Sequence, residues 1–256
     1  MYNLMPDILK KYPQLSGMYF TDTGSSYGCA DYIKENPQYS HIKIISHDLA
    51  ESTIQFLEEG LITASLSQDP IAQGYNPVMH LYNHITTGWI PQTPRLLTYL
   101  EIITHDNYKN FWESGKGVIQ TTEISARLVK PLNEDKTKPL RIVVLGRTET
   151  AFWEQTKKGV MAATDTLKEY NVTVEWIVPK ENEEEGDISA SVYGPLIDRL
   201  VKEKCDGIAV VASDRNLVPY INRAIAAGIP VVTWNTEPSN LANLIYTVKD
   251  QAEKLR

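Results

Sequence analysis

The sequence predicts an α/β protein made of two doubly wound lobes with parallel sheets. Short runs rich in Val and Ile, such as RIVVLG (141–146) and GIAVVA (207–212), alternate with segments of helical period, which is typical of βα units. These runs are apolar at nearly every position, so helices should cover both faces of each sheet. A polar segment, NEDKTKP (133–139), separates the two halves. The expected division is therefore 1–132, a linker at 133–139, and 140–256.

The elements are expected in the following order. In the first half, apolar runs predict strands, and helical periods lie between them; the strands are 17–21, 42–46, 63–67 and 96–103, and the helical segments lie around 27–35, 51–59 and 71–87. In the second half the predicted strands are 141–146, 172–178, 207–212 and 229–234. Apolar residues recurring at multiples of three or four predict the helices between them: Phe152, Val160, Ala163 and Leu167; Val192, Leu196 and Leu200; Leu217, Ile221, Ala224 and Ile225.

Composition excludes several classes of function. The net charge of −7 argues against a broad phosphate-binding face, so we expect no direct nucleic-acid contact from this segment. No apolar run is long enough to span a membrane, and residues 1–15 do not resemble a secretory signal. We therefore expect a cytoplasmic protein, or an extracytoplasmic one if a signal peptide has been removed. A homodimer is compatible with the sequence.

The cysteines and histidines give little support for a metal site. Two cysteines, Cys29 and Cys205, exclude a disulfide framework and a cysteine-based zinc site. His80 and His84 are four residues apart on a predicted helix and could face one metal, but the pair lacks the glutamate of His-Glu-x-x-His and a third nearby ligand. Glycine-rich phosphate loops are absent. The sequence therefore predicts no metal and no cofactor.

One motif suggests an enzyme. GSSYG (24–28) fits Gly-x-Ser-x-Gly with Ser26 at its centre, between a predicted strand and a predicted helix. Asp22 and Thr23 intervene between the strand and the first glycine, and no His-Gly-Gly segment lies upstream, so a small-residue turn is the competing interpretation. The alternative function is a serine hydrolase that uses Ser26 with Asp48 and one of His80, His84 and His105.

Polar and aromatic residues follow the ends of six predicted strands. These segments are TDTGSS (21–26), HD (47–48), QDP (68–70), RTETAFW (147–153), SDRN (213–216) and NTEPS (235–239). The carboxyl ends of parallel strands line the crevice where open α/β sheets bind ligands. Acids and amides there would bind hydroxyl groups, and Phe152, Trp153 and Trp234 would cover the C–H surface of a sugar-like ligand.

These residues carry a resemblance to the type I periplasmic-binding-protein superfamily, which includes sugar-binding proteins and the effector domains of LacI-type repressors. The first half resembles most of the C-terminal lobe: Thr21-Asp22-Thr23 stands where the family commonly has Thr-Asn-Asp, Ser46-His47-Asp48 where it has Gly-Phe-Asp, and Gln68-Asp69-Pro70 matches outright. The resemblance implies flavodoxin-like lobes and ligand contacts from Asp22, Asp48 and Gln68. His47, which follows the same strand end as Asp48, is a further candidate contact.

The second half resembles the N-terminal lobe. Glu149 to Trp153 correspond to the family's Asn-Pro-Phe-Phe, which implies that Phe152 and Trp153 stack on the ligand. IPVVTWNTE corresponds to a stretch that usually ends in Asp, often followed by Arg, whereas this chain has Asn235 and Thr236. That departure removes an acid and a guanidinium group that would bind hydroxyls strongly. Further ligand contacts are expected from Thr148, Asp214 and Asn235.

The order of the lobes is reversed relative to the family. A C-lobe without its opening strand and helix comes first, and an N-lobe follows. Two explanations stay open: the chain spans the junction of two tandem binding domains, which we expect, or it is a permuted single domain. Under the tandem interpretation the two half-sites belong to different clefts.

The predicted function is non-catalytic sensing of a small polar ligand, and a sugar or polyol is the expected ligand. Ligand would bind at the lobe interface and drive hinge closure. The expected role is the effector domain of a LacI-type transcription regulator. The alternative is an extracytoplasmic sugar-binding protein of a transporter or sensor. A structural domain that keeps the fold without a ligand is the third possibility.

Overall fold

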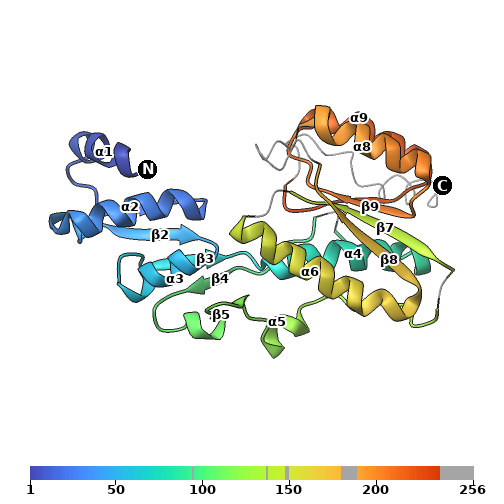
Figure 1. The fold of residues 1–256 in the computed structure, drawn as a ribbon, viewed down its shortest axis with the longest axis horizontal. Coiled ribbons are helices and arrows are strands. Elements are labelled where there is room, and N and C mark those ends of the chain that lie inside the picture. The colour runs from blue at the N-terminus through green and yellow to red at the C-terminus, as the bar shows by residue number, and fades with distance from the viewer. Residues whose placement is uncertain (94, 137, 148–149, 180–188, 237–256) are drawn as a thin grey trace. The chain divides into compact units, whose positions relative to one another are not determined.

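The computed structural model describes residues 1–93, 95–136, 138–147, 150–179 and 189–236, and the chain divides into two compact units (Figure 1). Unit 1 comprises Met1–Pro70 and Thr98–Ala126, and unit 2 comprises Ile71–Leu97 and Arg127–Arg256. The units thus assign 71–97 to the second half of the chain, whereas the sequence groups it with the first. The division predicted at 133–139 stays a prediction.

Unit 1 contains one mixed four-stranded sheet. Its main elements are α1 (Met5–Lys11), β1 (Gly17–Tyr19), α2 (Thr23–Glu35), β2 (Lys43–His47), α3 (Glu51–Glu58), β3 (Ala64–Ser67), β4 (Glu101–Ile103), the β5 (Trp112–Glu113) and β6 (Gly117–Val118) pair, and α5 (Thr122–Ala126). The sheet order is β1-β2-β3-β4, with β1 to β3 parallel and β4 antiparallel. The strand predicted at 96–103 corresponds to β4. This strand is much shorter than predicted, and it is antiparallel to β3.

The core of unit 1 forms where its helices cover the sheet. Met5 of α1, Cys29 of α2 and Leu57 of α3 are fully buried in one cluster with Ile44 of β2 and Ile103 of β4. Their apolar side chains recur at helical spacing, so each helix buries one face while its polar face stays in water.

Unit 2 contains a four-stranded sheet that is entirely parallel. Its main elements are α4 (Pro70–Thr87), β7 (Leu140–Leu145), α6 (Ala151–Leu167), β8 (Val172–Ile177), α8 (Ala190–Glu203), β9 (Gly207–Val210), α9 (Val218–Ala226) and β10 (Val231–Thr233). The order is β10-β9-β7-β8. This arrangement is the one predicted for a doubly wound lobe, and it places the carboxyl ends of all four strands at one edge.

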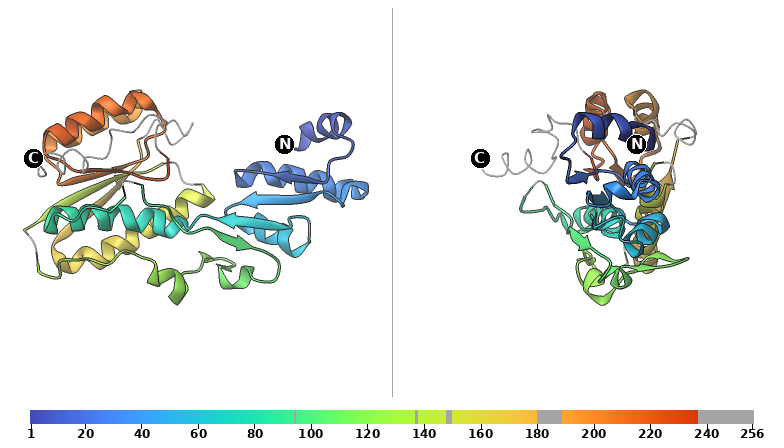
Figure 2. Two further views of the ribbon diagram at one scale, coloured as in Figure 1. Left: turned by 180° about the vertical axis from the view of Figure 1, so that it is seen from behind. Right: turned by 90° about the vertical axis from the view of Figure 1, so that its left-hand side faces the viewer.

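Both faces of the unit 2 sheet are covered, as predicted. Ile142 and Val144 of β7 join a cluster with α4 and α6, whereas Val143 and Leu145 join a second cluster with α8 and α9. Successive strand residues point to opposite faces, so an uninterrupted apolar strand supplies both cores. Figures 1 and 2 show α4 and α6 on one side of the sheet and α8 and α9 on the other.

Helices α4 and α6 cross at two glycines. A Cβ atom on Gly74 would lie 1.9 Å from the Thr156 carbonyl oxygen, and one on Gly159 would lie 2.1 Å from the Ile71 carbonyl oxygen. Only residues without a side chain allow the backbones to approach so closely. α4 therefore belongs to the core of unit 2, although β3 of unit 1 immediately precedes it in the chain.

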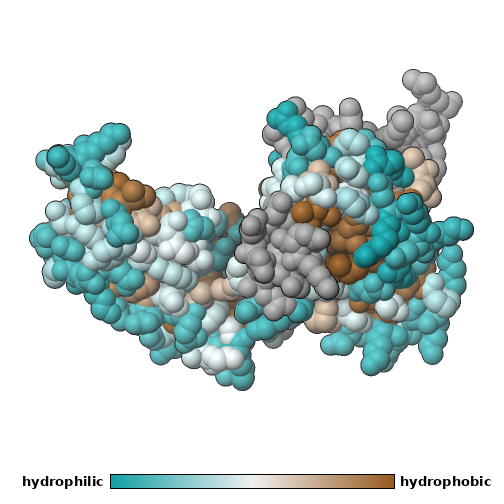
Figure 3. All heavy atoms as spheres, turned by 45° about the horizontal axis from the view of Figure 1, so that its top comes forward, coloured by the Kyte–Doolittle hydropathy of each residue, from teal (hydrophilic) through white to brown (hydrophobic). Residues whose placement is uncertain are grey.

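The surface in Figure 3 is hydrophilic or neutral over most of the visible described residues. Within the described residues, no helix combines the length and apolar character that crossing a membrane requires.

Candidate ligand-binding site

Asp48 is the central residue of a polar group in unit 1. It follows β2 directly, is 8% exposed, and adopts a left-handed backbone conformation with φ of 61°. Its backbone N–H donates to the Leu66 carbonyl at 2.7 Å, and its own carbonyl accepts from the Ser65 hydroxyl at 2.6 Å. These two bonds fix the turn, so the carboxylate is held at the carboxyl edge of the sheet.

The Asp48 carboxylate is only half satisfied. Oδ2 accepts from the Gln68 amide at 3.1 Å, while Oδ1 is buried and has no hydrogen-bond partner among the described residues. Burial raises the pKa of this carboxyl, and the Gln68 hydrogen bond partly opposes the rise. A buried acceptor without a donor is costly, so Oδ1 is suited to accept a hydrogen bond from a ligand hydroxyl.

His47 and Tyr19 extend this group along the sheet. The His47 Nε2 and the Tyr19 hydroxyl are 2.7 Å apart, and the two rings meet edge to face. Nδ1 of His47 is buried without a partner in the described part of the chain. The sequence suggested His47, but it gave no reason to select Tyr19, because only the register of β1 against β2 brings the tyrosine beside the histidine.

Asp22 and Ser26 have structural roles in α2. The Asp22 carboxylate caps the helix by accepting from the Ser25 backbone N–H at 2.7 Å, while its side chain remains exposed. Ser26 lies inside α2 with no exposed surface, donates to the Thr23 carbonyl at 2.6 Å, and is 2.7 Å from the Ser46 hydroxyl. A serine in this setting is not at a strand-to-helix elbow, so the motif GSSYG is a helix segment.

Unit 2 gathers aromatic rings at the carboxyl ends of its strands. Trp153 lies at the start of α6, 5.1 Å from Phe152 and 5.6 Å from Trp234 between ring centroids. Trp176 of β8 lies 6.1 Å from Trp234. The Nε1–H groups of Trp176 and Trp234 are buried and have no acceptor among the described residues. We call these four rings the aromatic group.

Two further features complete the surroundings of the aromatic group. The Arg147 guanidinium lies 5.7 Å from the centroid of the Trp153 ring, a distance typical of a cation–π contact. The Trp176 ring lies against Gly146, where a Cβ atom would be 2.1 Å from the indole. The sequence did not select Trp176, because it lies inside a strand and its contact with Trp234 depends on the order of the sheet.

Asn235 follows β10, and its side chain is hydrogen-bonded to Gln73 of α4. It has a left-handed backbone with φ of 62°, and its amide donates to the Gln73 side chain at 2.9 Å. Its Oδ1 accepts from the Thr236 hydroxyl at 2.8 Å. Both amide atoms of Asn235 are therefore engaged within unit 2, which gives this residue a positioning role in the structure.

The remaining predicted contacts are placed as follows. The Asp214 carboxylate accepts from the backbone N–H groups of Ala190 at 2.8 Å and Asn216 at 2.9 Å, which hold the pKa of this carboxyl below its usual value. Thr148 lies outside the described residues, as does the acidic run at 181–187. The ligand contacts predicted for Asp22, Asp214, Thr148 and Asn235 stay predictions.

The two histidines of α4 both contact Trp89. His80 stacks on the indole with ring centroids 5.0 Å apart and planes 7° apart, and His84 Nδ1 lies 3.0 Å from the Trp89 carbonyl oxygen. No group of three or more His, Cys, Asp or Glu residues suited to a metal ion occurs in the described segments.

A family model described as a periplasmic binding protein domain matches residues 1–88 and 142–253. The chain belongs to this family. The family comparison agrees with the resemblance found in the sequence, and the two mostly parallel four-stranded sheets agree with its α/β fold.

Three similar proteins illustrate the relationship. A xylose/arabinose-binding protein of Sulfolobus acidocaldarius is 25% identical over 109 residues, covering 39% of this chain and 26% of that protein. A sugar-binding protein of a sugar ABC transporter from Bacillus halodurans is 27% identical over 43% of this chain and 41% of its own, with a TM-score of 0.38. An ABC transporter periplasmic solute binding protein from Actinobacillus succinogenes, solved with D-allose, is 14% identical over 98% of this chain and 66% of its own, with a TM-score of 0.52.

The last of these shares the fold with our chain. The chain spans about a quarter of the length of the Sulfolobus relative and less than two thirds of each of the solved structures.

Proposed function

We propose that this chain binds a small sugar without chemical conversion, and that the Asp48 group of unit 1 and the aromatic group of unit 2 are each a sugar-contacting surface. The observation that carries the proposal is the unpartnered Oδ1 of the buried Asp48 carboxylate, whose other oxygen is held by Gln68. A sugar hydroxyl would satisfy this acceptor with a charge-assisted hydrogen bond. The binding of xylose or arabinose by the Sulfolobus relative supports a sugar as the ligand class.

The aromatic group suits the apolar part of a sugar. A pyranose or furanose ring has a C–H surface that packs on an aromatic face, and its hydroxyls need acceptors and donors at the edge. The unpartnered indole N–H groups of Trp176 and Trp234 are donors of the kind that such hydroxyls require. Binding without catalysis fits the position of Ser26, which is buried within a helix and engaged by Ser46 and Thr23.

Titration calorimetry with D-xylose, L-arabinose and D-allose tests the proposal. Asp48→Asn keeps the size of the side chain and removes its charge. We expect binding about tenfold to a hundredfold weaker, because a hydrogen bond to a charged group contributes about 1.5–3 kcal/mol. Asp31→Asn, at an exposed position of α2, is the matched control and should bind like the wild type.

A second pair of variants tests unit 2. Phe152→Ala removes a half-buried ring from the first turn of α6, whereas Met161→Ala truncates a side chain that is 39% exposed on the same helix. We expect only the first to weaken sugar binding. Equal affinity of the wild type, Asp48→Asn and Phe152→Ala for every sugar, or no binding at all, would contradict the proposal.

The biological role follows from the sequence analysis. We propose an effector domain of a LacI-type transcription regulator located in the cytoplasm, with an extracytoplasmic sugar-binding protein as the alternative. Recording whether the complete gene encodes a helix-turn-helix or a secretory signal beside this segment distinguishes the two.

A further inference from the structure

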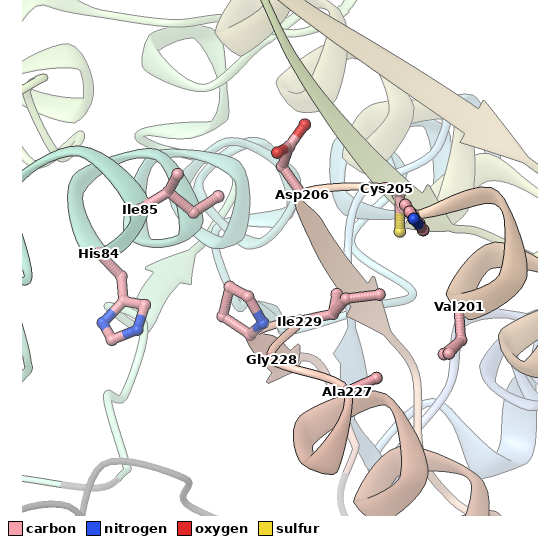
Figure 4. A pocket seen from close by; sticks show the side chains of 10 residues that line it. His84, Ile85, Val201, Cys205, Asp206, Ala227, Gly228 and Ile229 are labelled. Carbon is pink, nitrogen blue, oxygen red and sulfur yellow. The ribbon is translucent and has the colours of Figure 1, made fainter. Parts of the chain in front are cut away.

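A cavity of about 550 Å³ lies in unit 2 at the amino ends of β9 and β10 (Figure 4). The aromatic group lies at the opposite, carboxyl ends of the strands. Three elements form its walls. His84 and Ile85 come from α4, Val201 comes from α8, and Ile229 lies in the loop between α9 and β10. Cavities of this size accommodate small molecules in other proteins.

The lining of the cavity is part apolar and part polar, with His84, Lys204 and Asp206 as its polar side chains. Ile85, Val201, Ile229 and Pro230 contribute hydrocarbon surface. The Cys205 thiol also lines the cavity. Burial raises its pKa to about 11, so the thiol is protonated and uncharged at neutral pH. Gly228, with φ of 83°, lies at the rim, and a Cβ atom there would meet nothing within 4 Å.

His84 supplies a hydrogen-bond acceptor. Its Nδ1 lies 3.0 Å from the Trp89 carbonyl oxygen, and a carbonyl can only accept, so Nδ1 carries the proton. Nε2 of the neutral ring is then an acceptor. The imidazole is consequently fixed in one tautomer by a contact outside the cavity, and it offers its other nitrogen to a donor.

The electrostatic setting favours a positive charge. Helices α8 and α9 end at Glu203 and Ala226, beside the cavity, and helix C-termini carry partial negative charge. Asp206 at the cavity wall is anchored by the Arg141 backbone N–H at 2.8 Å. The Arg141 guanidinium is itself paired with Glu175 at 2.7 Å and Glu203 at 2.9 Å. Lys204 lies exposed at the rim, where its ammonium group can remain in water.

We propose that this cavity binds a second small molecule, one with a compact apolar body and an ammonium head group. The body would pack among Ile85, Val201 and Ile229, and the head group would donate to His84 Nε2 at the negative ends of α8 and α9. The cavity lies at the strand ends opposite the aromatic group. A molecule bound in it would therefore not contact the rings that are proposed to contact the sugar.

Three probes with one hydrocarbon body test the head group. We would titrate cyclohexylmethylamine, cyclohexylmethanol and cyclohexanecarboxylate into the ¹⁵N-labelled full chain at pH 8, and follow the backbone amide shifts of Val201, Gly228 and Ile229. We expect the amine to bind about tenfold more tightly than the carboxylate, with the alcohol between them. Carboxylate binding equal to or tighter than that of the amine, or no saturable shift with any probe, would overturn the proposal.

Paired variants locate the probe. Ala227→Trp covers the cavity from an exposed wall position, and Ala226→Trp places the same ring on the neighbouring exposed residue, which does not line the cavity. His84→Asn retains a donor at the position of Nδ1 and removes the acceptor Nε2. We expect Ala227→Trp and His84→Asn to weaken amine binding about tenfold or more and Ala226→Trp to leave it unchanged.

Sugar titrations of the same variants separate this proposal from the proposed function. Unchanged sugar binding is expected in all three. If the amine binds while no sugar does, the proposed function fails and the cavity proposal stands. If Ala226→Trp weakens amine binding as much as Ala227→Trp does, the probe binds elsewhere and the cavity proposal fails.

Discussion

Asp48 is a carboxylate that the protein keeps buried and incompletely bonded. Its pKa is raised because ionising a buried carboxyl group is unfavourable. Groups with perturbed pKa values are common at functional sites. The sequence predicted the residue from its place after a strand, and the resemblance supported it. The sequence did not predict that Gln68 would hold one oxygen and leave the other without a partner, because the two residues are 20 positions apart.

The buried charge of Asp48 predicts a particular pH dependence of stability. Its pKa is higher in the folded state than in the unfolded state, so the folded chain binds more protons as the pH falls. Ionisation therefore costs stability above the folded pKa, and the cost disappears below the unfolded pKa. We expect Asp48→Asn to melt at a higher temperature than the wild type at pH 7, with a smaller difference at pH 4. A constant difference between pH 7 and 4 would contradict this assignment.

His80 predicts the opposite behaviour in unit 2. Burial lowers its pKa to about 4, so between pH 6.5 and 4 the unfolded state takes up a proton that the folded state excludes. The wild type should lose on the order of 2–3 kcal/mol of stability across that range. His80→Phe keeps a ring against Trp89 and should lose less, as measured by urea unfolding at both pH values. His41→Phe changes an exposed histidine of unit 1 and should retain the full loss.

At the scale of elements, α4 shows how packing overrides order in the chain. The sequence correctly predicted its helical period and placed Pro70 at its start, where no backbone N–H is needed. It grouped the helix with the strands that precede it. The helix instead packs on the unit 2 sheet, with Met79 and Tyr82 fully buried beside Ile142 and Val144. Periodicity identifies an apolar face, but it does not say which sheet that face will cover.

The crossing of α4 and α6 predicts a large effect from very small substitutions. Gly74→Ala or Gly159→Ala would place a methyl group against a backbone carbonyl and force the helices apart. We expect each to lower the free energy of unfolding by about 2–3 kcal/mol, as overpacked sites commonly do. Gly24→Ala is the control, since its nearest neighbour would be 3.6 Å away. Urea denaturation followed by tryptophan fluorescence measures the difference, and equal stabilities of Gly74→Ala and Gly24→Ala would refute the close approach.

For the whole molecule, the division into two units has an energetic consequence. Each of the hydrophobic clusters of the described residues lies within one unit. Because the cores are separate, local unfolding of one unit need not open the other. We expect Gly159→Ala to reduce the hydrogen-exchange protection of the Val143 and Val144 amides in unit 2 while leaving Ile44 and Ile45 of unit 1 unchanged. An equal loss of protection in both units would show that they unfold together.

The sequence by itself determined the α/β class, the approximate positions of most strands, and the polar and aromatic residues at their carboxyl ends. These follow from local patterns, because apolar runs, helical period and turn residues are encoded within short segments. Some strand boundaries were predicted wrongly for the same reason. The apolar residues Leu97 and Leu100 were included in the strand predicted at 96–103. They are instead 84% and 63% exposed and precede β4.

Only the tertiary structure decided which of these residues act together. The antiparallel direction of β4, the assignment of α4 to unit 2, the bond between Asp48 and Gln68 and the contact of Trp176 with Trp234 all join segments that are distant in the chain. Such contacts depend on sheet order and on close packing between helices, and no short stretch of sequence contains both partners. The cavity beside His84 is of the same kind, since its walls come from α4, α8 and the loops before β9 and β10.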